Sequence, residues 1–285
     1  MMAAARRTTA VAMALALAGA GARGASDLQR DAGIPVLIYH EIVTDPARAA
    51  GETVIALDRF EAQMRHLASD GWQTLSIDEL VAVMRNERPA PAKAVVLTFD
   101  DGWKSVLNAL PVLERHRMRA SFWIITGAGI GNDYLEWSDV ERLANNPRFE
   151  FGSHTVSHPW DAKDNLVTWM HAGTPGKDRA AVRAELADSK ATLEAKTRRR
   201  IDYLAWPVGW YSDEMVELAK EVGYRALLTA EDGGNAPGGD VFRIRRVFVD
   251  GACSLESFRR ILVAPVYQPC QTNGRATFGH TPPTD

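Results

Sequence analysis

Two adjacent carboxylates follow an apolar, β-branched run in the segment AVVLTFDDG. Asp100 and Asp101 end this run, and Gly102 allows a tight turn directly after them. Two carboxylates this close repel each other unless a cation or a proton separates them. The pair is consistent with a cation site, with the nucleophilic aspartate of a phosphatase, or with a structural role in which Asp101 caps the next helix.

A pair of histidines favours the cation site. The segment FGSHTVSHP carries His154 and His158 four residues apart, directly after another strand-like run. Two imidazoles at this spacing can reach one ion, and together with one carboxylate they suit Zn²⁺ or a similar divalent ion. Three protein ligands leave one coordination position open, which is typical of a catalytic metal rather than a structural one.

Seven apolar runs alternate with helical patterns along the chain and must position these side chains. The runs are residues 34–40, 94–100, 120–126, 148–154, 202–208, 224–230 and 242–249, and the helical patterns are residues 57–70, 76–86, 178–196, 212–222 and 254–263. This alternation predicts parallel strands joined by helices. Because no Gly-rich dinucleotide fingerprint or P-loop is present, it favours a (β/α) barrel or a relative, with the chemistry where the strands end.

The two motifs resemble those of a known family. TFDDG at 98–102 and HTVSHP at 154–159 are similar to the first two motifs of the polysaccharide deacetylases of carbohydrate esterase family 4. The resemblance implies an α/β fold, a distorted (β/α)7-type barrel with a single catalytic domain. It further implies that Asp100 is the general base and that Asp101, His154 and His158 hold a divalent metal. Zn²⁺ is the first expectation, and Co²⁺, Ni²⁺ or Fe²⁺ would suit the same ligands.

The third motif of that family is matched only in part, by AWPVG at 205–209. Ala205 stands where the family usually has the arginine that orients the base. Val208 replaces a tyrosine whose backbone N–H helps to bind the oxyanion, a role that the Val208 N–H can keep. Arg243 or Arg245 is a candidate to replace the missing arginine, although such residues are more often solvated.

Tryptophans near the motifs are candidates for sugar stacking. Trp206 lies within the third motif and Trp210 directly follows it, and aromatic faces stack well on sugar rings. Core packing is the alternative for each of them, because a tryptophan buries a large area.

The start of the predicted domain resembles one subgroup of the family. In PVLIYHEI, His40 ends the first predicted strand, and the only late histidine is His280. The subgroup that deacetylates exported poly-β-1,6-N-acetylglucosamine carries its acid-bearing strand permuted to the front, reading Tyr-His. The resemblance implies that His40 is the catalytic acid, with a core histidine as the alternative. A carbohydrate-binding pseudoenzyme, or a deacetylase of peptidoglycan, chitin oligomers or acetylated xylan, stays an alternative function.

The composition is that of a globular protein, with 46% hydrophobic and 24% charged residues among 285. The net charge of -3 gives no reason to expect nucleic acid as a partner. Residues 1–24 have the layout of a secretory signal peptide, 25–267 form the expected deacetylase domain, and 268–285 a polar tail. We therefore expect export to the periplasm or the medium, no membrane span after signal removal, and a polysaccharide or a biofilm export assembly as partner.

The chain has two cysteines, Cys253 and Cys270. In an oxidising compartment they can form a disulfide that closes the C-terminal segment. Two buried free thiols are the alternative, because geometry decides between them.

Overall fold

The computed structural model describes residues 32–49, 53–127, 133–171, 173–267 and 269–270. The predicted signal peptide at 1–24 lies outside this part of the chain, as do His280 and all of the predicted tail except residues 269 and 270. None of the described helices combines the length and the apolar character needed to cross a bilayer.

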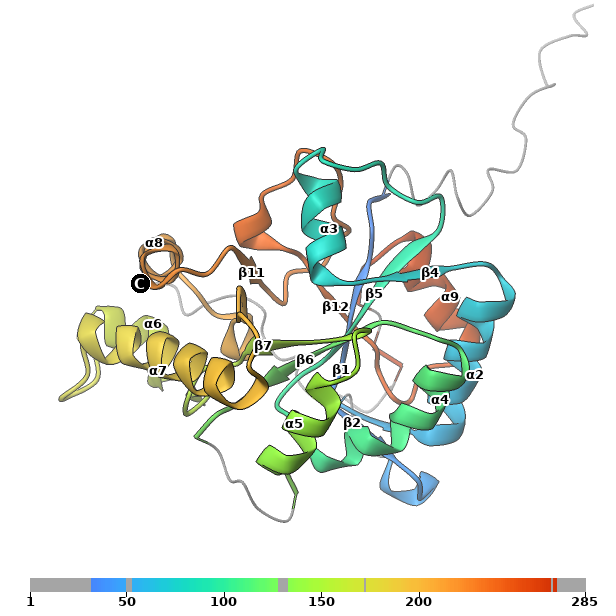
Figure 1. Cartoon of the computed structure of the whole chain (residues 1–285), viewed down its shortest axis with the longest axis horizontal. Helices are drawn as coiled ribbons and strands as arrows, with labels where there is room; N and C mark the ends of the chain where they lie inside the picture. The colour runs from blue at the N-terminus through green and yellow to red at the C-terminus, as the bar shows by residue number, and fades with distance from the viewer. Residues whose placement is uncertain (1–31, 50–52, 128–132, 172, 268, 271–285) are drawn as a thin grey trace, which may run out of the picture.

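A sheet of parallel strands forms the centre of the protein (Figure 1). Its strands follow the order β11-β10-β7-β6-β5-β1-β12, and β4 (Gln73–Leu75) also pairs with β5. The seven strands of the main path are β1 (Val36–Tyr39), β5 (Ala94–Phe99), β6 (Ala120–Ile124), β7 (Phe149–Ser153), β10 (Tyr203–Ala205), β11 (Ala226–Leu228) and β12 (Val247–Phe248). Each of the seven predicted runs contains one of them, so the predicted strands are confirmed.

The two edges of the sheet meet through the segment that precedes β12. Leu228, at the end of β11, forms a parallel bridge with Ile244, and the Thr229 N–H donates to the carbonyl of Ile244 at 2.9 Å. The sheet therefore closes into a distorted barrel, as predicted. The run 242–249 is not one continuous strand, because the 3₁₀ helix η4 (Val241–Arg243) occupies its start, capped by the Asp240 carboxylate.

Helices surround the barrel (Figure 1). They are α2 (Leu57–Ser69), α3 (Ile77–Met84), α4 (Leu110–Arg115), α5 (Trp137–Ala144), α6 (Leu166–Met170), α7 (Arg179–Thr197), α8 (Asp213–Val222) and α9 (Leu255–Val263). The five predicted helices correspond to α2, α3, α7, α8 and α9. The capping box of Ser76 and Glu79 starts α3, and Gly223 ends α8 in the left-handed conformation. The others, α4 to α6, have eight residues or fewer, too few for the helical period to stand out; α3, which is equally short, was found with the help of its Ser76 cap.

Short elements fill the connections between the barrel strands. They are the strands β2 (Glu41–Val43), β3 (Val54–Ala56), β8 (Trp160–Asp161) and β9 (Asp164–Asn165), and the 3₁₀ helices η1 (Pro46–Arg48), η2 (Lys104–Ala109) and η3 (Pro207–Gly209). The pair β8 and β9 forms a small antiparallel hairpin directly after the second histidine of the HTVSHP motif.

The side chains of each barrel strand alternate between two apolar clusters, because successive strand residues face opposite sides. Leu37, Leu97, Leu204, Leu227 and Val247 belong to the larger cluster, which contains most of the apolar helix residues. Val36, Val96, Ala205, Leu228 and Ile244 belong to the smaller cluster, with α3. The second set faces the barrel interior. When the alternation of these inward-facing residues is followed beyond the ends of the strands, the next inward-facing side chains are polar and lie around the mouth of the barrel.

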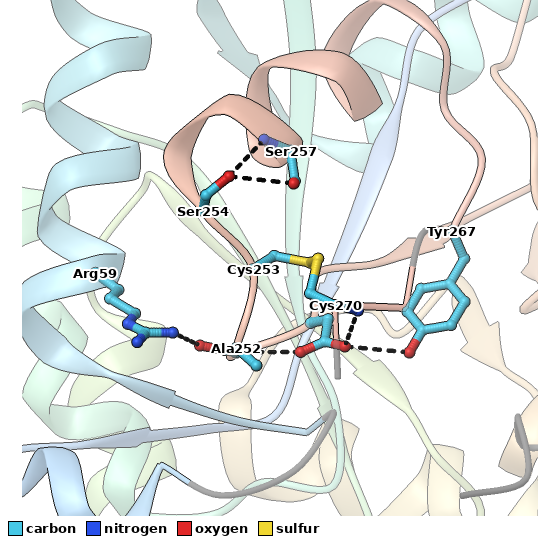
Figure 2. Close-up of a disulfide and its surroundings, with 9 residues drawn as sticks. Arg59, Ala252, Cys253, Ser254, Ser257, Tyr267 and Cys270 are labelled. Carbon is cyan, nitrogen blue, oxygen red and sulfur yellow. Dashed lines mark hydrogen bonds between the residues drawn. A yellow bond between two sulfur atoms is a disulfide. The ribbon is translucent and has the colours of Figure 1, made fainter. Parts of the chain in front are cut away.

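A disulfide joins Cys253, just before α9, to Cys270 (Figure 2). The two Cα atoms are 5.0 Å apart. The buried carboxylate of Asp250 supports this link, because it accepts hydrogen bonds from the N–H groups of Ala252 at 2.7 Å and Cys270 at 3.1 Å. Of the two alternatives for the cysteines, the structure contains the disulfide, which is consistent with an oxidising compartment.

Candidate metal centre

A cavity of about 260 Å³ opens at the mouth of the barrel. Asp100 directly follows β5, His154 follows β7 and His40 follows β1. The residues that line the cavity are His40, Thr53, Asp100, Asp101, Trp103, His154, His158, Trp160, Trp206, Val208, Gly209, Ala230, Arg246 and Phe248. The cavity thus brings together every predicted site residue except Trp210 and the two candidate arginines, Arg243 and Arg245.

A turn at the end of β5 aims both carboxylates at this cavity. Consecutive strand residues normally face opposite sides, but Asp101 has φ 69° and Gly102 has φ 80°, which turns the second carboxylate back toward the first. Asp101 does not cap the following 3₁₀ helix, whose N-cap is Trp103 without a side-chain hydrogen bond. The structural alternative for Asp101 is therefore wrong.

One carboxylate oxygen faces two imidazole nitrogens. Asp101 Oδ1 lies 3.4 Å from His154 Nε2 and 3.6 Å from His158 Nε2. The three ligand atoms all lie within 4.8 Å of one another. Neighbouring ligands of a tetrahedral ion with bonds of about 2.05 Å are about 3.3 Å apart, so the three side chains need little movement to hold one.

In two of these ligands, His154 and Asp101, the other polar atom of the side chain is already bonded. His154 Nδ1 lies 2.8 Å from the carbonyl oxygen of Ala205, which can only accept, so Nδ1 carries the proton and Nε2 is left to bind an ion. Trp103 Nε1 donates to Asp101 Oδ2 at 2.9 Å, which orients Oδ1 toward the histidines. Such outer partners are the usual companions of metal ligands. The donor set and its supports therefore fit a divalent metal.

The loop between the two histidines is fixed by a carboxylate from α7. Glu185 accepts hydrogen bonds from the N–H groups of Val156 and Ser157, both at 2.8 Å, and from Ser157 Oγ at 2.6 Å. The loop needs this support because Thr155 has φ 67° and His158 has φ 48°, a conformation that is costly for residues other than glycine. Glu185 therefore holds His158 in position opposite His154.

The first carboxylate, Asp100, has a different partner. Arg246 Nη1 lies 2.7 Å from Asp100 Oδ1, and both side chains are almost completely buried. Arg246 Nε donates to the carbonyl of Thr229 at 2.7 Å, so the guanidinium has a fixed orientation. Asp100 Oδ2 is 3.8 Å from His154 Nε2. Asp100 therefore lies beside the three-ligand cluster but is not part of it.

The local charges set the protonation of the acidic groups. Burial alone would raise the pKa of Asp100, but the positive charges of Arg246 and of nearby histidines hold this pKa below its ordinary value. Burial opposes ionisation of Asp101 as well, yet the hydrogen bond with His154 and the imidazole charges keep the pKa of Asp101 well below its usual range. Both carboxylates are therefore ionised at neutral pH.

The two histidines differ. Burial and the neighbouring His154 lower the pKa of His158 to about 4, so its imidazole is neutral and ready to bind an ion. Burial would also lower the pKa of His154, but the hydrogen bond with Asp101 and the two carboxylate charges raise it above its ordinary value. A cation that binds here therefore competes with a proton on His154.

His40 and Val208 border the same cavity. The ring of His40 stacks on Phe248 with centroids 5.7 Å apart, and its buried Nδ1 has no hydrogen-bond partner among the described residues. Val208 has φ 49° and ψ 10°, an outlier for a β-branched residue. Such strain is often found at functional sites.

The candidate sugar-stacking tryptophans lie differently from what we expected. Trp206 is fully buried and stacks on Tyr211, which leaves its ring no open face for a sugar. Trp210 is partly buried, packs against the apolar core and does not line the cavity. The exposed tryptophan at the cavity is Trp160, in β8.

The fold and these side chains define a barrel protein with a candidate divalent-metal centre at its mouth. The chain belongs to the polysaccharide deacetylase family, whose model matches residues 87–227. Among curated proteins, YxkH of Bacillus subtilis, which is named as a member of this class, is 27% identical over 233 residues, 81% of this chain and 76% of its own. The poly-β-1,6-N-acetyl-D-glucosamine N-deacetylase of Escherichia coli K12 is 24% identical over 81% of this chain and only 38% of its own length.

Solved structures agree with this assignment. IcaB from Ammonifex degensii superposes with a TM-score of 0.71 at 25% identity, over 82% of this chain and 98% of that one. The deacetylase PplD of Streptococcus pyogenes, solved with acetate, gives a TM-score of 0.68 at 26% identity, over 80% of this chain and 97% of that one.

Sequence reasoning missed Arg246 and chose its neighbours instead. Arg243 pairs with exposed Asp213 at 2.5 Å, and Arg245 is exposed, so neither reaches Asp100. The strand alternation carried the missing signal, because Val247 and Val249 pack outward and residue 246 must then face inward. Glu185 had no comparable signal, since its role depends on how α7 packs.

Proposed function

We propose that this protein is a metal-dependent N-deacetylase, which hydrolyses the acetamide of N-acetylhexosamine units in an exported or cell-surface polysaccharide. One observation carries the proposal: an ionised carboxylate, Asp100, is fixed by Arg246 beside a three-ligand cluster inside one cavity. A pure binding protein has no use for such a base. The altered third motif was the main ground for a pseudoenzyme, and Arg246 supplies the positive charge that Ala205 lacks.

Asp101, His154 and His158 would hold the metal, with Zn²⁺ as the first candidate because of its preference for this donor set. When bound, a divalent ion supplies Lewis acidity, which polarises the acetyl carbonyl and lowers the pKa of water. Asp100 then acts as the general base, taking the proton of the attacking water. Arg246 keeps the carboxylate ionised and holds Oδ1, so that Oδ2 faces the cluster.

Two further groups complete the chemistry. The Val208 N–H is assigned as a donor to the developing oxyanion, a kind of contact whose loss costs about 3 kcal/mol in other enzymes. His40 is assigned as the acid that protonates the departing amine. Its stacking on Phe248 fixes the ring plane at the edge of the cavity.

The relatives support the substrate class. The E. coli protein and several Staphylococcus aureus proteins are named as poly-β-1,6-N-acetyl-D-glucosamine N-deacetylases, and the Tyr39-His40 pair resembles the Tyr-His of that subgroup. We therefore propose a poly-β-1,6-N-acetylglucosamine-like polymer as substrate. The disulfide and the predicted signal peptide support export, where such a polymer and its assembly machinery are found.

The test is acetate release from β-1,6-linked N-acetylglucosamine oligomers by the purified protein. We expect release in the presence of Zn²⁺ and its loss after dialysis against a chelator, with recovery when metal is added back. Oligomer binding without acetate release at any metal loading would instead identify a carbohydrate-binding protein. Release from β-1,4-linked chitin oligomers or acetylated xylan alone would keep the reaction and change the substrate.

A further inference from the structure

The cavity at the metal centre is too small for more than the reacting part of a polymer. Its volume of about 260 Å³ is below the roughly 300 Å³ at which sites begin to enclose a whole small ligand. On the proposed function, the acetamide and its own sugar ring fill this space. The next sugar unit of the chain must then lie on the rim.

Trp160 occupies that rim. Trp160 is 67% exposed, and it and Val266 are the two exposed large hydrophobic residues in the described part of the chain. Unlike Val266, Trp160 also lines the cavity. It follows His158 by two residues, so its Cα lies at most about 7.6 Å from that of His158. An exposed indole is therefore tied to the metal centre by a very short segment.

The hairpin that carries Trp160 is firmly anchored. Asn165, opposite Trp160 in the hairpin, donates through Nδ2 to the carbonyls of Asp161 at 2.9 Å and Ala162 at 3.2 Å. Its Oδ1 accepts from Val167 N–H at 2.9 Å and so starts α6. A ring held by a rigid element costs little ordering free energy on binding.

We propose that Trp160 is a sugar-binding platform, on which the hexopyranose unit next to the one being deacetylated stacks. The ligand class follows from the chemistry of the surface. A flat indole presents an apolar face with a polar N–H edge, and a hexopyranose presents an apolar C–H face bordered by hydroxyls. This inference depends on the proposed function for the identity of the polymer, but it concerns binding and not the reaction.

The test compares Trp160→Ala and Trp160→Phe with wild-type protein, using β-1,6-linked and β-1,4-linked N-acetylglucosamine tetramers as probes. We expect Trp160→Ala to weaken tetramer binding by roughly 2- to 12-fold, the range for an aromatic contact of about 0.5–1.5 kcal/mol. The KM of the tetramer should rise by more than kcat falls. Trp160→Phe should recover most of the binding, because it keeps an aromatic face.

Controls separate this inference from the proposed function. Val266→Ala, which alters the other exposed hydrophobic residue, should change neither binding nor turnover, and zinc content should be equal in all variants. Binding is measured calorimetrically on zinc-loaded Asp100→Asn protein, where no reaction consumes the tetramer. If tetramer binding depends on Trp160 but the wild type releases no acetate, the sugar-binding role of Trp160 is supported and the proposed deacetylase activity is refuted.

Two results would overturn the platform. One is acetate release with Trp160→Ala binding the tetramer as tightly as wild type, which would leave the deacetylase intact. The other is an absence of binding of both tetramers to the zinc-loaded protein.

Discussion

Arg246 Nη1 lies 2.7 Å from Asp100 Oδ1, and this ion pair is almost completely buried at the mouth of the barrel. Burial makes the pair consequential in two ways. Removing one partner of a buried pair typically costs about 3–5 kcal/mol of stability. The guanidinium also lowers the pKa of Asp100, so its loss should change how activity depends on pH.

For this reason we expect Arg246→Lys to move the acidic limb of the pH profile of kcat/KM to higher pH. Arg246 holds the folded-state pKa of Asp100 below its ordinary value. A lysine lacks the separate Nε that fixes the guanidinium on the Thr229 carbonyl, so its charge should lie less firmly beside Asp100 and that pKa should rise. More alkaline solution is then needed to ionise the base. The exposed neighbour offers a matched control, Arg245→Lys, whose profile should coincide with wild type. Identical profiles for both variants would contradict the role of Arg246.

Substitutions of the two adjacent aspartates should have different effects on turnover and on zinc content. Asp100→Asn is expected to lower kcat by about 10²- to 10⁴-fold while the protein still binds one equivalent of zinc, because Asp100 lies outside the ligand cluster. Asp101→Asn should lose zinc, because Asp101 supplies the carboxylate ligand. Zinc content by atomic absorption, measured beside acetate release, separates the two. Loss of zinc from Asp100→Asn would show that our division of roles is wrong.

Glu185 should matter for metal affinity although it touches neither metal nor substrate. Glu185→Gln weakens three hydrogen bonds that hold the loop between His154 and His158. We expect zinc affinity to fall about 10- to 100-fold, the usual effect of losing an outer partner, as measured by competition with a chromophoric chelator. Asp188→Asn, an exposed change on the same helix, is the control and should bind zinc normally.

His40 can be tested through the leaving group. An amine must be protonated to depart, whereas p-nitrophenolate leaves without an acid. We therefore expect His40→Ala to lower turnover of the acetamide by about 10²- to 10⁴-fold and to affect hydrolysis of p-nitrophenyl acetate much less, with zinc content unchanged. His171→Ala alters an exposed histidine and serves as control. An equal loss of turnover on both substrates would show that His40 is not the catalytic acid.

A pH effect on stability is expected away from the site. Glu150 accepts hydrogen bonds from the Ile77 N–H at 2.7 Å and from Ser121 Oγ at 3.0 Å, but burial, together with the charge of Asp78, raises its pKa. A raised folded-state pKa means that the fold loses stability as the pH rises from the unfolded value of about 4.3 through the folded value. Glu150→Gln should therefore gain stability relative to wild type between pH 4 and pH 7.

Urea unfolding at several pH values measures this difference. Glu114→Gln, which alters an exposed carboxyl in α4, serves as the control. A difference for Glu150→Gln that falls with rising pH would contradict the expectation.

The parts of the site that sequence predicts are those fixed by local position. Asp100 and Asp101 directly follow an apolar strand, and His154 directly follows another, so the convergence of strand ends in a barrel brings them together. Distant contacts are different. Arg246 was missed because η4 and a bridge interrupt its strand pattern, and Glu185 because only the packing of α7 brings it to the histidine loop.

The tryptophans illustrate a second limit. Several of them lie close to the motifs in sequence, and composition does not distinguish a ring that fills the core from one that faces solvent. Trp206 is buried and Trp160 is exposed, although each follows a motif residue by few positions. The difference arises from the β8–β9 hairpin, which two short polar strands form with little sequence pattern of their own.

The last strand, β12, pairs with the first, β1, and the segment around Ile244 closes the barrel against β11. Arg246, between these two contacts, thereby brings the guanidinium that Asp100 needs. In a closed ring every strand ends at the same central point, so a charge deleted from one strand can be supplied by another. Motif order along such a chain is then a poor guide to whether function has been lost. Relatives that lack a signature residue should be judged by which side chain reaches the centre, whatever its place in the sequence.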